Sequence, residues 1–310
     1  MDRLHSMRVF CKVIDAGSFA SAAREMSLSP AVVTRLVADL EEHLDARLIH
    51  RTTRRLALTD VGAAHLERAR QILADVEEAE ALASTATVQP RGHLRVLAPP
   101  AFAAHQLIKR WPAFHAQHPM VTLELATPGP VDAVDADFDV CVVIAGRQPL
   151  AGDFVARRLA CSEVIACASS AYLARKGWPQ HPHDLAQHET MLPTVLREIT
   201  FLRGDGDGES VALAPQRPML ATTHTDTLVA AARHGLGIVG LPSFVAEEAL
   251  IDRSLERVLP QWHLAIQTLY AVTPTRRHVP ARTRAFIDFL VQAFGGEDSD
   301  PWLHAAGVQK

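Results

Sequence analysis

Apolar residues recur at steps of three and four through residues 16–44, a spacing that predicts two short helices joined by a tight turn. Ser18 is the expected N-cap of the first helix, which runs to about Met26. Ser29 is the expected N-cap of the second helix, with Pro30 at the first position, where proline's missing N–H is tolerated. One face of the second helix is apolar and is expected in the core: Val33, Val37, Leu40 and Leu44.

The opposite face of the second helix is small and polar, with one arginine. Its members are Ser29, Pro30, Ala31, Thr34, Arg35 and Ala38. A helix, a tight turn and a second helix with such an outer face predict a helix-turn-helix. The second helix of that motif enters the major groove of DNA with its N-terminal residues at the base edges. A plain α-hairpin is the alternative.

Residues 46–59, ARLIHRTTRRLALT, alternate in the manner of a β-hairpin. Four arginines and no acidic residue lie between Arg47 and Thr59, and the tip carries Arg51, Arg54 and Arg55. Beside a helix-turn-helix, such a wing neutralises phosphates or places arginine in the minor groove. A solvated charged face is the alternative.

Residues 60–88 predict one long helix of about 40 Å. It is expected to end before residues 89–92 (QPRG). Its apolar positions repeat at three- and four-residue steps, as in a helix packed along a partner helix. They are Leu66, Ala69, Leu73, Val76 and Ala79, followed by Leu82 or Ala83.

Beyond residue 91, short β-rich runs alternate with helical runs, which predicts α/β architecture with a parallel sheet. The expected strands are 93–98, 121–125, 139–145, 163–168, 236–241 and 266–272. The expected helices are 104–118, 170–177, 226–235, 243–250 and 281–294. Residues 296–310 are expected to form a poorly ordered tail.

Composition narrows the classes of protein. The chain has 310 residues, enough for two or three domains, and is 48% hydrophobic and 21% charged, as is ordinary for a globular protein. Its net charge of -4 gives no general attraction to nucleic acid, so DNA binding must be local. The N-terminus lacks the pattern of a signal peptide, and no apolar run approaches the roughly 18 residues that span a bilayer, so a cytoplasmic protein without membrane contact is expected. The four cysteines are expected as buried thiols, with a redox pair of Cys161 and Cys167 as the alternative.

Residues 234–240, HGLGIVG, contain the G-x-G-x-x-G pattern of dinucleotide-binding sites. In that site a strand precedes the glycines and a helix follows them. Here the predicted order is reversed, so Gly235 is expected to cap a helix, and Gly237 and Gly240 to lie where a strand passes close to its neighbours. No NAD and no other cofactor is expected, although an NAD-dependent oxidoreductase with a helical N-terminal appendage is kept as the alternative function.

Two further segments have residues typical of metal sites. Residues 181–184 (HPHD) are expected to be a surface loop at a helix start. Residues 204–209 (GDGDGE) lack the third Asp/Asn ligand and the glutamate of a calcium loop and are expected as a hairpin turn. We therefore expect neither a metal ion nor a catalytic site.

The segment Leu4 to Gly62, with GSFASAA, LSPAVVTR and DLEEHLDARLIHRTTRRLALTDVG, strongly resembles the LysR-type transcriptional regulators. DVCVVIAG, FVARRL, ASSAYLARKGWPQHPHDLAQH, AARHGLGIVGLP and RAFIDFL resemble segments of the same family's effector domain. Asp45 and Ile49 depart from the family's usual Gly and Phe, but neither change removes a DNA-facing charge. By this resemblance Ser29, Pro30, Thr34, Arg35, Arg51 and Arg54 face DNA. The expected DNA-binding residues also include Ala31, on the same helix face, and Thr52, in the wing.

The resemblance implies a multi-domain fold. An all-α-rich winged helix-turn-helix domain (1–60) is followed by a long linker and dimerisation helix (61–89) and a bilobed α/β effector domain (90–295) like the type 2 periplasmic binding proteins. Lobe I comprises 90–161 and 268–295, and lobe II comprises 162–267. Crossover strands near Cys161 and Thr268 would join the lobes, and 296–310 form the tail.

A small-molecule effector is expected between the two lobes. By the resemblance, the turn 98–103 (APPAFA) occupies the family's effector-contacting position, where Pro100 and Ala101 replace the usual hydroxyl. This replacement suggests a less polar effector or different anchoring residues. The helix start near Thr225 offers N–H groups to an anion, with ordinary capping as the alternative. The effector-binding residues expected are Pro100, Ala101, Phe102, Thr127, Ala145, Thr200, Phe201 and Thr225.

The expected partners follow from this assignment. They are a double-stranded DNA operator, a small organic acid or aromatic effector, further copies of the chain in a homodimer or homotetramer, and RNA polymerase. A pure solute-binding protein is the last alternative, disfavoured by the helix-turn-helix and the lack of a signal peptide.

Overall fold

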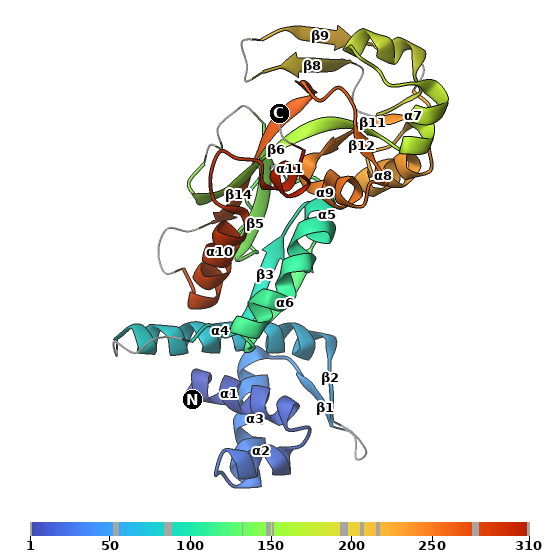
Figure 1. Cartoon of the computed structure of the whole chain (residues 1–310). Helices are drawn as coiled ribbons and strands as arrows, with labels where there is room; N and C mark the ends of the chain where they lie inside the picture. The colour runs from blue at the N-terminus through green and yellow to red at the C-terminus, as the bar shows by residue number, and fades with distance from the viewer. Residues whose placement is uncertain are drawn as a thin grey trace. The chain divides into compact units, whose positions relative to one another are not determined.

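A computed structural model of the chain (Figure 1) describes residues 2–51, 56–83, 89–131, 133–146, 150, 152–192, 198–204, 208–214, 218–274 and 279–308. At residues 51, 74, 77–83 and 192 the description covers the backbone alone. The chain divides into two compact units. The first holds Met1–Leu94 with the short segments His118–Thr122 and Pro280–Arg282, and the second holds Arg95–Gln117, Leu123–Val279 and Thr283–Lys310.

Three helices open the first unit: α1 Arg3–Asp15, α2 Phe19–Glu25 and α3 Pro30–Leu44. The two predicted caps are confirmed, because the Ser18 hydroxyl accepts a hydrogen bond from Ser21 N at 3.0 Å and the Ser29 hydroxyl accepts one from Val32 N at 3.3 Å. The apolar face of α3 is buried as predicted at Val33, Val37 and Leu40, in a core that includes Val9, Phe10, Val13 and Ala69. The prediction is wrong for Leu44, the last residue of the helix, which is 37% exposed.

The wing is an antiparallel pair of strands, β1 Ile49–Arg51 and β2 Leu56–Leu58, as predicted. The helix α4 Asp60–Ala83 follows, with 24 residues and hence a length of about 36 Å. The predicted continuation through 84–88 lies outside the described residues. The α4 helix starts in close contact with the wing, since a Cβ on Gly62 would lie 1.9 Å from the carbonyl oxygen of Leu48.

The second unit is built on a nine-stranded sheet with the order β10-β7-β11-β6-β14-β5-β3-β4, and β12 pairs with β6. Parallel pairing is confirmed for β3 with β5, β11 with β7 and β10 with β7. The sheet is nevertheless mixed, because β6 and β14 are antiparallel to each other. In addition, β6 is antiparallel to β11, and β14 is antiparallel to β5. The strands are β3 Gly92–Leu97, β4 Val121–Ala126, β5 Val140–Ala145, β6 Val155–Ala168, β7 Thr190–Leu192, β10 Leu220–Ala221, β11 Ile238–Pro242, β12 Glu256–Arg257 and β14 Ala265–Thr273.

The two long strands β6 and β14 connect two lobes, and the predicted lobe boundaries fall within them. In lobe I, α6 Ile108–Gln117 and α10 Ala281–Phe294 pack through the rings of Phe114 and Phe286, whose centroids are 5.2 Å apart. Lobe II carries α7 Ser170–Lys176, the 3-10 helix Pro182–Gln187, α8 Thr225–Arg233 and α9 Ser243–Ile251.

Lobe II also has a small sheet of β8 Ile199–Arg203, β9 Ser210–Leu213 and β13 Trp262–His263. Strands β8 and β9 are antiparallel, so the GDGDGE segment lies between two paired strands, as a hairpin turn requires. Residues 205–207 of that segment lie outside the described residues.

The helix predicted over 104–118 has three parts. A short α5 Pro100–Phe102 leads into a π-helical turn, Ala103–Leu107, before α6 begins. The N–H of Ile108 donates to the carbonyl of Ala103, five residues earlier, which widens the helix at this point. Such π-turns often occur at functional sites.

The HGLGIVG segment is a helix-to-strand connection, as predicted. After α8, Gly235 has a φ of +73°, its N–H donates to Ala232 O, and Leu236 N–H donates to Ala231 O. This is a Schellman cap, which requires a left-handed residue. A Cβ on Gly237 would lie 2.4 Å from the carbonyl oxygen of Glu189, so the strand passes its neighbour too closely for a side chain. The order of elements is the reverse of a nucleotide-binding turn.

The prediction of a poorly ordered tail is wrong for residues 296–308. A short helix, α11 Pro301–Ala305, ends the described chain, and the side chains of Trp302 and Leu303 are 1% and 5% exposed. Asp300 caps this helix by accepting hydrogen bonds from the N–H groups of Trp302 and Leu303. The polar run GEDSD suggested disorder, but the two apolar residues that follow it pack into the core.

Candidate DNA interface and lobe junction

The outer face of α3 carries the residues predicted to meet DNA. Ser29, Pro30, Ala31 and Arg35 are exposed, and Thr34 is half-buried. The Thr34 hydroxyl donates to the carbonyl of Pro30 at 2.8 Å and keeps its lone pairs for a donor on DNA. Within the part of the chain that the structure describes, Arg35 has no ion-pair partner, so its charge is available to a ligand. The helix therefore presents one cation among small side chains.

The wing completes the predicted interface only in part. The backbone of Arg51 ends β1. Thr52 and Arg54 lie outside the described residues, and their predicted phosphate contacts stay predictions.

A buried carboxylate that the sequence analysis missed fixes the wing to α3. Glu41 is 4% exposed, and its Oε1 accepts hydrogen bonds from the N–H groups of Leu48 at 2.8 Å and Ile49 at 3.1 Å. Its Oε2 lies 3.2 Å from Arg47 Nη1. The spacing Val33, Val37, Glu41 places this residue on the core face, and that step of four was the available signal.

Asp45 ends α3 in a conformation that suits glycine. Its φ is 49° and its ψ is 37°, in the left-handed region that asparagine, aspartate and glycine adopt more readily than other residues. The departure from the family's usual glycine therefore keeps the chain path into the wing, at some conformational cost.

The predicted effector residues fall into three groups by burial. Thr127 and Thr200 are exposed, and Pro100, Ala101 and Thr225 are half-buried. Phe102, Ala145 and Phe201 are buried, at 0%, 9% and 2% exposure. Phe102 packs against the rings of Phe244 and Phe294, and Phe201 belongs to the core of lobe II, so these side chains support the turn and strand that carry them.

Two of the predicted segments are joined by a hydrogen bond across the lobes. His105 Nε2, in the π-turn of lobe I, lies 2.7 Å from Asp226 Oδ1, in the first turn of α8 in lobe II. The π-turn follows Pro100–Phe102 directly, and Asp226 follows Thr225. The structure thus brings the β3–α5 turn and the start of α8 together through residues that were not predicted.

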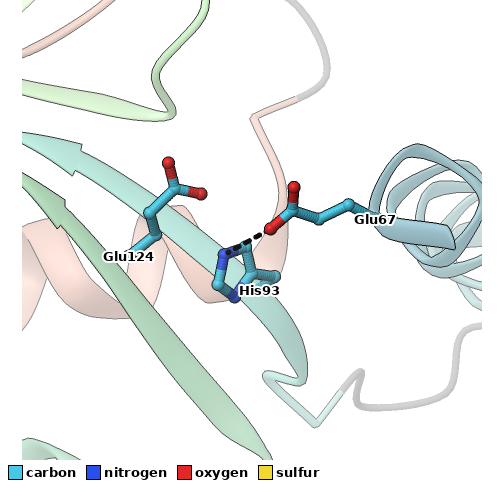
Figure 2. A group of neighbouring side chains, drawn as sticks. All are labelled: Glu67, His93 and Glu124. Carbon is cyan, nitrogen blue, oxygen red and sulfur yellow. Dashed lines mark ion pairs between the residues drawn. The ribbon is translucent and has the colours of Figure 1, made fainter. Parts of the chain in front are cut away.

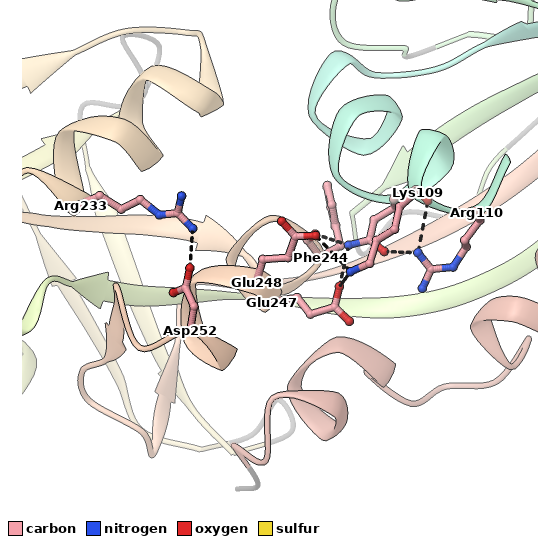
Figure 3. Close-up of polar contacts among 8 residues, drawn as sticks. Lys109, Arg110, Arg233, Phe244, Glu247, Glu248 and Asp252 are labelled. Atoms are coloured by element: carbon pink, nitrogen blue, oxygen red, sulfur yellow. Dashed lines mark hydrogen bonds and ion pairs between the residues drawn. The ribbon is translucent and has the colours of Figure 1, made fainter. Parts of the chain in front are cut away.

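A second polar network joins the π-turn and α6 to α9 (Figure 3). Gln106 Nε2 donates to Phe244 O at 2.6 Å and to Glu247 Oε2 at 3.1 Å, and Lys109 pairs with Glu247 at 3.1 Å and Glu248 at 3.2 Å. Burial lowers the pKa of Lys109, but its hydrogen bonds to the two glutamates outweigh burial and raise that pKa above its usual value. No local pattern signals this network, since its members come from segments about 140 residues apart.

Comparison with known protein families identifies the family of this chain. A family model described as a bacterial regulatory helix-turn-helix protein of the lysR family matches residues 4–63. A second, described as the LysR substrate binding domain, matches residues 87–295. The chain belongs to the LysR family. It is a DNA-binding transcriptional regulator with a substrate-binding domain, not an enzyme, and the oxidoreductase alternative is not supported.

Individual relatives and solved structures are similar to this chain over nearly its whole length. YhjC, an HTH-type regulator of Escherichia coli K12, is 33% identical over 294 residues, covering 94% of this chain and 97% of the relative. An HTH-type transcriptional repressor of Pseudomonas aeruginosa is 31% identical, and the match covers 95% of this chain and 93% of the relative. The structure of CrgA, a LysR-type regulator from Neisseria meningitidis, aligns with a TM-score of 0.58 at 29% identity, covering 94% and 98%. Members of this family bind DNA and small-molecule effectors and are typically oligomeric.

The cysteines of this LysR-type regulator do not support an internal redox pair. Cys161 and Cys167 are both free and lie six residues apart on β6, about 20 Å along an extended strand. A disulfide needs Cα atoms within about 7 Å. Burial raises the pKa of the Cys167 thiol to about 12, which further lowers its reactivity.

The histidine-rich segments have structural partners. His181 caps the helix Pro182–Gln187, and Asp184 accepts from the N–H of His181 in return, as predicted for a helix start. His93, outside these segments, also has partners. Figure 2 shows His93 beside Glu67, with Nε2 3.9 Å from Glu67 Oε1. The Nδ1 atom of His93 bonds the hydroxyl of Thr122 at 2.9 Å.

No described helix has the length and apolar character to cross a membrane.

Proposed function

We propose that this LysR-type regulator binds its operator as a homodimer or homotetramer through α3 and the wing, and responds to a small aromatic or weakly acidic effector held between the lobes. The exposed face Ser29–Arg35 carries the DNA part of the proposal. It combines a free guanidinium with small neighbours, which suits bidentate readout of a guanine edge in the major groove. Arg51, Thr52 and Arg54 supply the phosphate contacts.

The effector part rests on the contact between His105 and Asp226. The β3–α5 turn and the start of α8 face each other there, and both were expected to meet the effector. Asp226 already places a negative charge in the first turn of α8, where the helix dipole would favour an anion. A second carboxylate is disfavoured beside it, and the turn at Pro100 and Ala101 has no hydroxyl to offer. These features favour an aromatic or weakly acidic compound over a strong acid.

Oligomerisation is proposed to run through α4. Three residues of the predicted seam, Leu66, Ala69 and Leu73, are buried in the core of the DNA-binding unit itself. The proposed contact therefore uses Val61 and Ile72, which are 56% and 41% exposed and which a second copy would cover. Two paired DNA-binding units then read two half-sites together. Effector binding shifts the population of subunit arrangements, and with it operator spacing and the access of RNA polymerase in the cytoplasm.

A gel-shift assay on DNA upstream of the regulator's gene tests the DNA proposal. Arg35→Ala is expected to bring operator affinity toward that for random DNA, while Arg157→Ala, which changes an exposed arginine of the second unit, is expected to bind like wild type. If Arg35→Ala binds both DNAs like wild type, the interface is wrongly assigned. Thermal shift with small aromatics and organic acids, followed by footprinting, identifies the effector.

A further inference from the structure

The C-terminal segment, residues 296–308, lies along the strand that joins the two lobes. The N–H of Gly296 donates to Leu159 O at 2.9 Å, and the N–H of Cys161 donates to Ser299 O at 3.1 Å. The N–H of Glu163 donates to Asp300 Oδ2 at 2.8 Å. Strand β14 pairs with β6 along one edge, and β11 pairs with the other edge only from Val164 onward. The C-terminal segment therefore supplies hydrogen bonds to that other edge over the preceding five residues.

Trp302 anchors this segment in a cluster of four rings. Its ring centroid lies 5.7 Å from that of Phe244 on α9 and 5.5 Å from that of Phe294 on α10. Phe102, in the turn expected to meet the effector, contacts the same two phenylalanines at 5.7 and 5.6 Å. Lobe I contributes Phe102 and Phe294, and lobe II contributes Phe244. Trp302 therefore joins both lobes behind the β3–α5 turn.

Asp300 fixes the segment at the same place. One carboxylate oxygen accepts from the N–H groups that begin α11, and the other from Glu163 N on β6. The carboxylate also bonds the hydroxyl of Ser243, at the start of α9, and Ser243 in turn bonds Ser162 of β6 at 2.8 Å. Burial raises the pKa of Asp300, against the effect of these hydrogen bonds. A single side chain thus ties α11, β6 and α9 together.

We propose that residues 296–308 form a brace across the lobe junction, in which Trp302 and Asp300 are positioning residues for the effector-binding turn. The proposal rests on the proposed effector site. β6 passes from one lobe to the other, and the brace is bonded to it at Cys161 and Glu163. Arg158 pairs with Asp298 on the lobe I side, and Trp302 packs on α9 on the lobe II side. These contacts come from residues beyond the matched substrate-binding domain, which ends at 295.

A distance measurement between the lobes tests the brace without effector or DNA. Spin labels at Gln117→Cys on α6 and Ala174→Cys on α7 report the lobe separation, because both positions are exposed. Cys161→Ser removes the one native thiol that is not buried, and an excess of unlabelled chain suppresses distances between subunits. The variants are Trp302→Ala, Asp300→Asn and a chain ending at Gly295, with His304→Ala, on the exposed side of α11, as the matched control.

The brace predicts a broader distance distribution for Trp302→Ala and for the shortened chain, a smaller broadening for Asp300→Asn, and no change for His304→Ala. A cooperative thermal transition shows that each variant is folded. If the shortened chain does not fold, the two point variants decide. Unchanged distributions in the folded variants overturn the brace.

The effector response is measured on the same variants and separates the two proposals. A broadened distribution with no response to any compound by the wild-type chain keeps the brace and removes the effector site. An unchanged distribution with a normal response removes the brace and keeps the effector site.

Discussion

The carboxylate of Glu41, on the helix predicted to read DNA, accepts a hydrogen bond from the backbone nitrogen of Leu48 at the base of the wing, at 2.8 Å. The same oxygen accepts a second bond from Ile49 N at 3.1 Å. A buried carboxylate that satisfies two backbone donors holds helix and wing at one fixed distance. The positions of the residues predicted to meet the major groove and the phosphates are therefore coupled.

Glu41→Ala is expected to destabilise the DNA-binding unit by about 3 kcal/mol, because two buried N–H groups lose a charged acceptor. Operator affinity falls as well, since the wing is released from α3. Thermal unfolding and gel shift measure the two effects. The exposed neighbour Glu42→Ala is the control and should change stability by less than about 0.5 kcal/mol. Equal stability of the two variants would show that the Glu41 bonds contribute nothing.

Asp45→Gly is expected to stabilise the same unit by about 0.5–1 kcal/mol. Glycine adopts a φ of 49° without the steric penalty that a Cβ carries, and it removes a negative charge from the negative end of a helix dipole. Asp45→Asn keeps a residue that tolerates this region and removes only the charge, so a smaller gain is expected. A glycine variant that melts at or below wild type would contradict this account.

Local signals explain what the sequence could predict. Ser18 and Ser29 cap their own helices, and the apolar steps of α3 depend on residues three or four positions apart, so α2 and α3 were predicted almost to the residue. The strands with continuous apolar runs were found for the same reason. The predicted HGLGIVG connection was confirmed because a left-handed helix cap is a local property of Gly235.

Long-range contacts explain what the sequence could not predict. Trp302 is buried by Phe244 and Phe294, and no local pattern connects these positions. The contact between His105 and Asp226 joins residues 121 positions apart. The parallel-sheet prediction missed the antiparallel crossover strands, since strand direction depends on how two lobes are connected.

Arg54→Ala is expected to weaken binding to operator and random DNA alike, because a wing arginine on phosphate carries no base information. Removing one arginine from a phosphate lowers the slope of log affinity against log salt concentration by about 1. Titrations at several salt concentrations with both DNAs measure this slope. Arg35→Ala is the comparison, expected to change the operator more than random DNA. An unchanged slope for Arg54→Ala would place this residue away from the phosphates.

Glu189 in lobe II makes stability depend on acidic pH. Hydrogen bonds from Lys176 and Tyr172, each at 2.8 Å, lower the pKa of Glu189 from 4.5 to about 2. A carboxyl with a lowered folded pKa stabilises above its unfolded pKa and loses this contribution as pH falls from about 4.5 toward 2. Its side chain is 35% exposed, so the contribution is below about 1 kcal/mol.

Glu189→Gln is therefore expected to be less stable than wild type at neutral pH, with a difference that shrinks between pH 4.5 and about 2. Thermal melts across this range measure the difference. Glu198→Gln, an exposed position of the same lobe, is the control. A difference that stays constant down to pH 2 would mean that packing, not charge, causes the effect.

Asp226→Asn is expected to weaken the effector response, because the contact with His105 stabilises the arrangement in which the two lobes enclose a ligand. The pair is partly exposed, 22% at His105 and 39% at Asp226, so the effect is at most about 1 kcal/mol, or about fivefold in the effector concentration for half-maximal thermal shift. Asp252→Asn breaks a matched pair with Arg233 inside lobe II, also drawn in Figure 3, and leaves the lobe junction untouched. If both variants need the same effector concentration as wild type, the inter-lobe pair does not favour the bound state. An increase for Asp226→Asn alone is the result expected of a ligand that binds the closed lobes more tightly than the open ones.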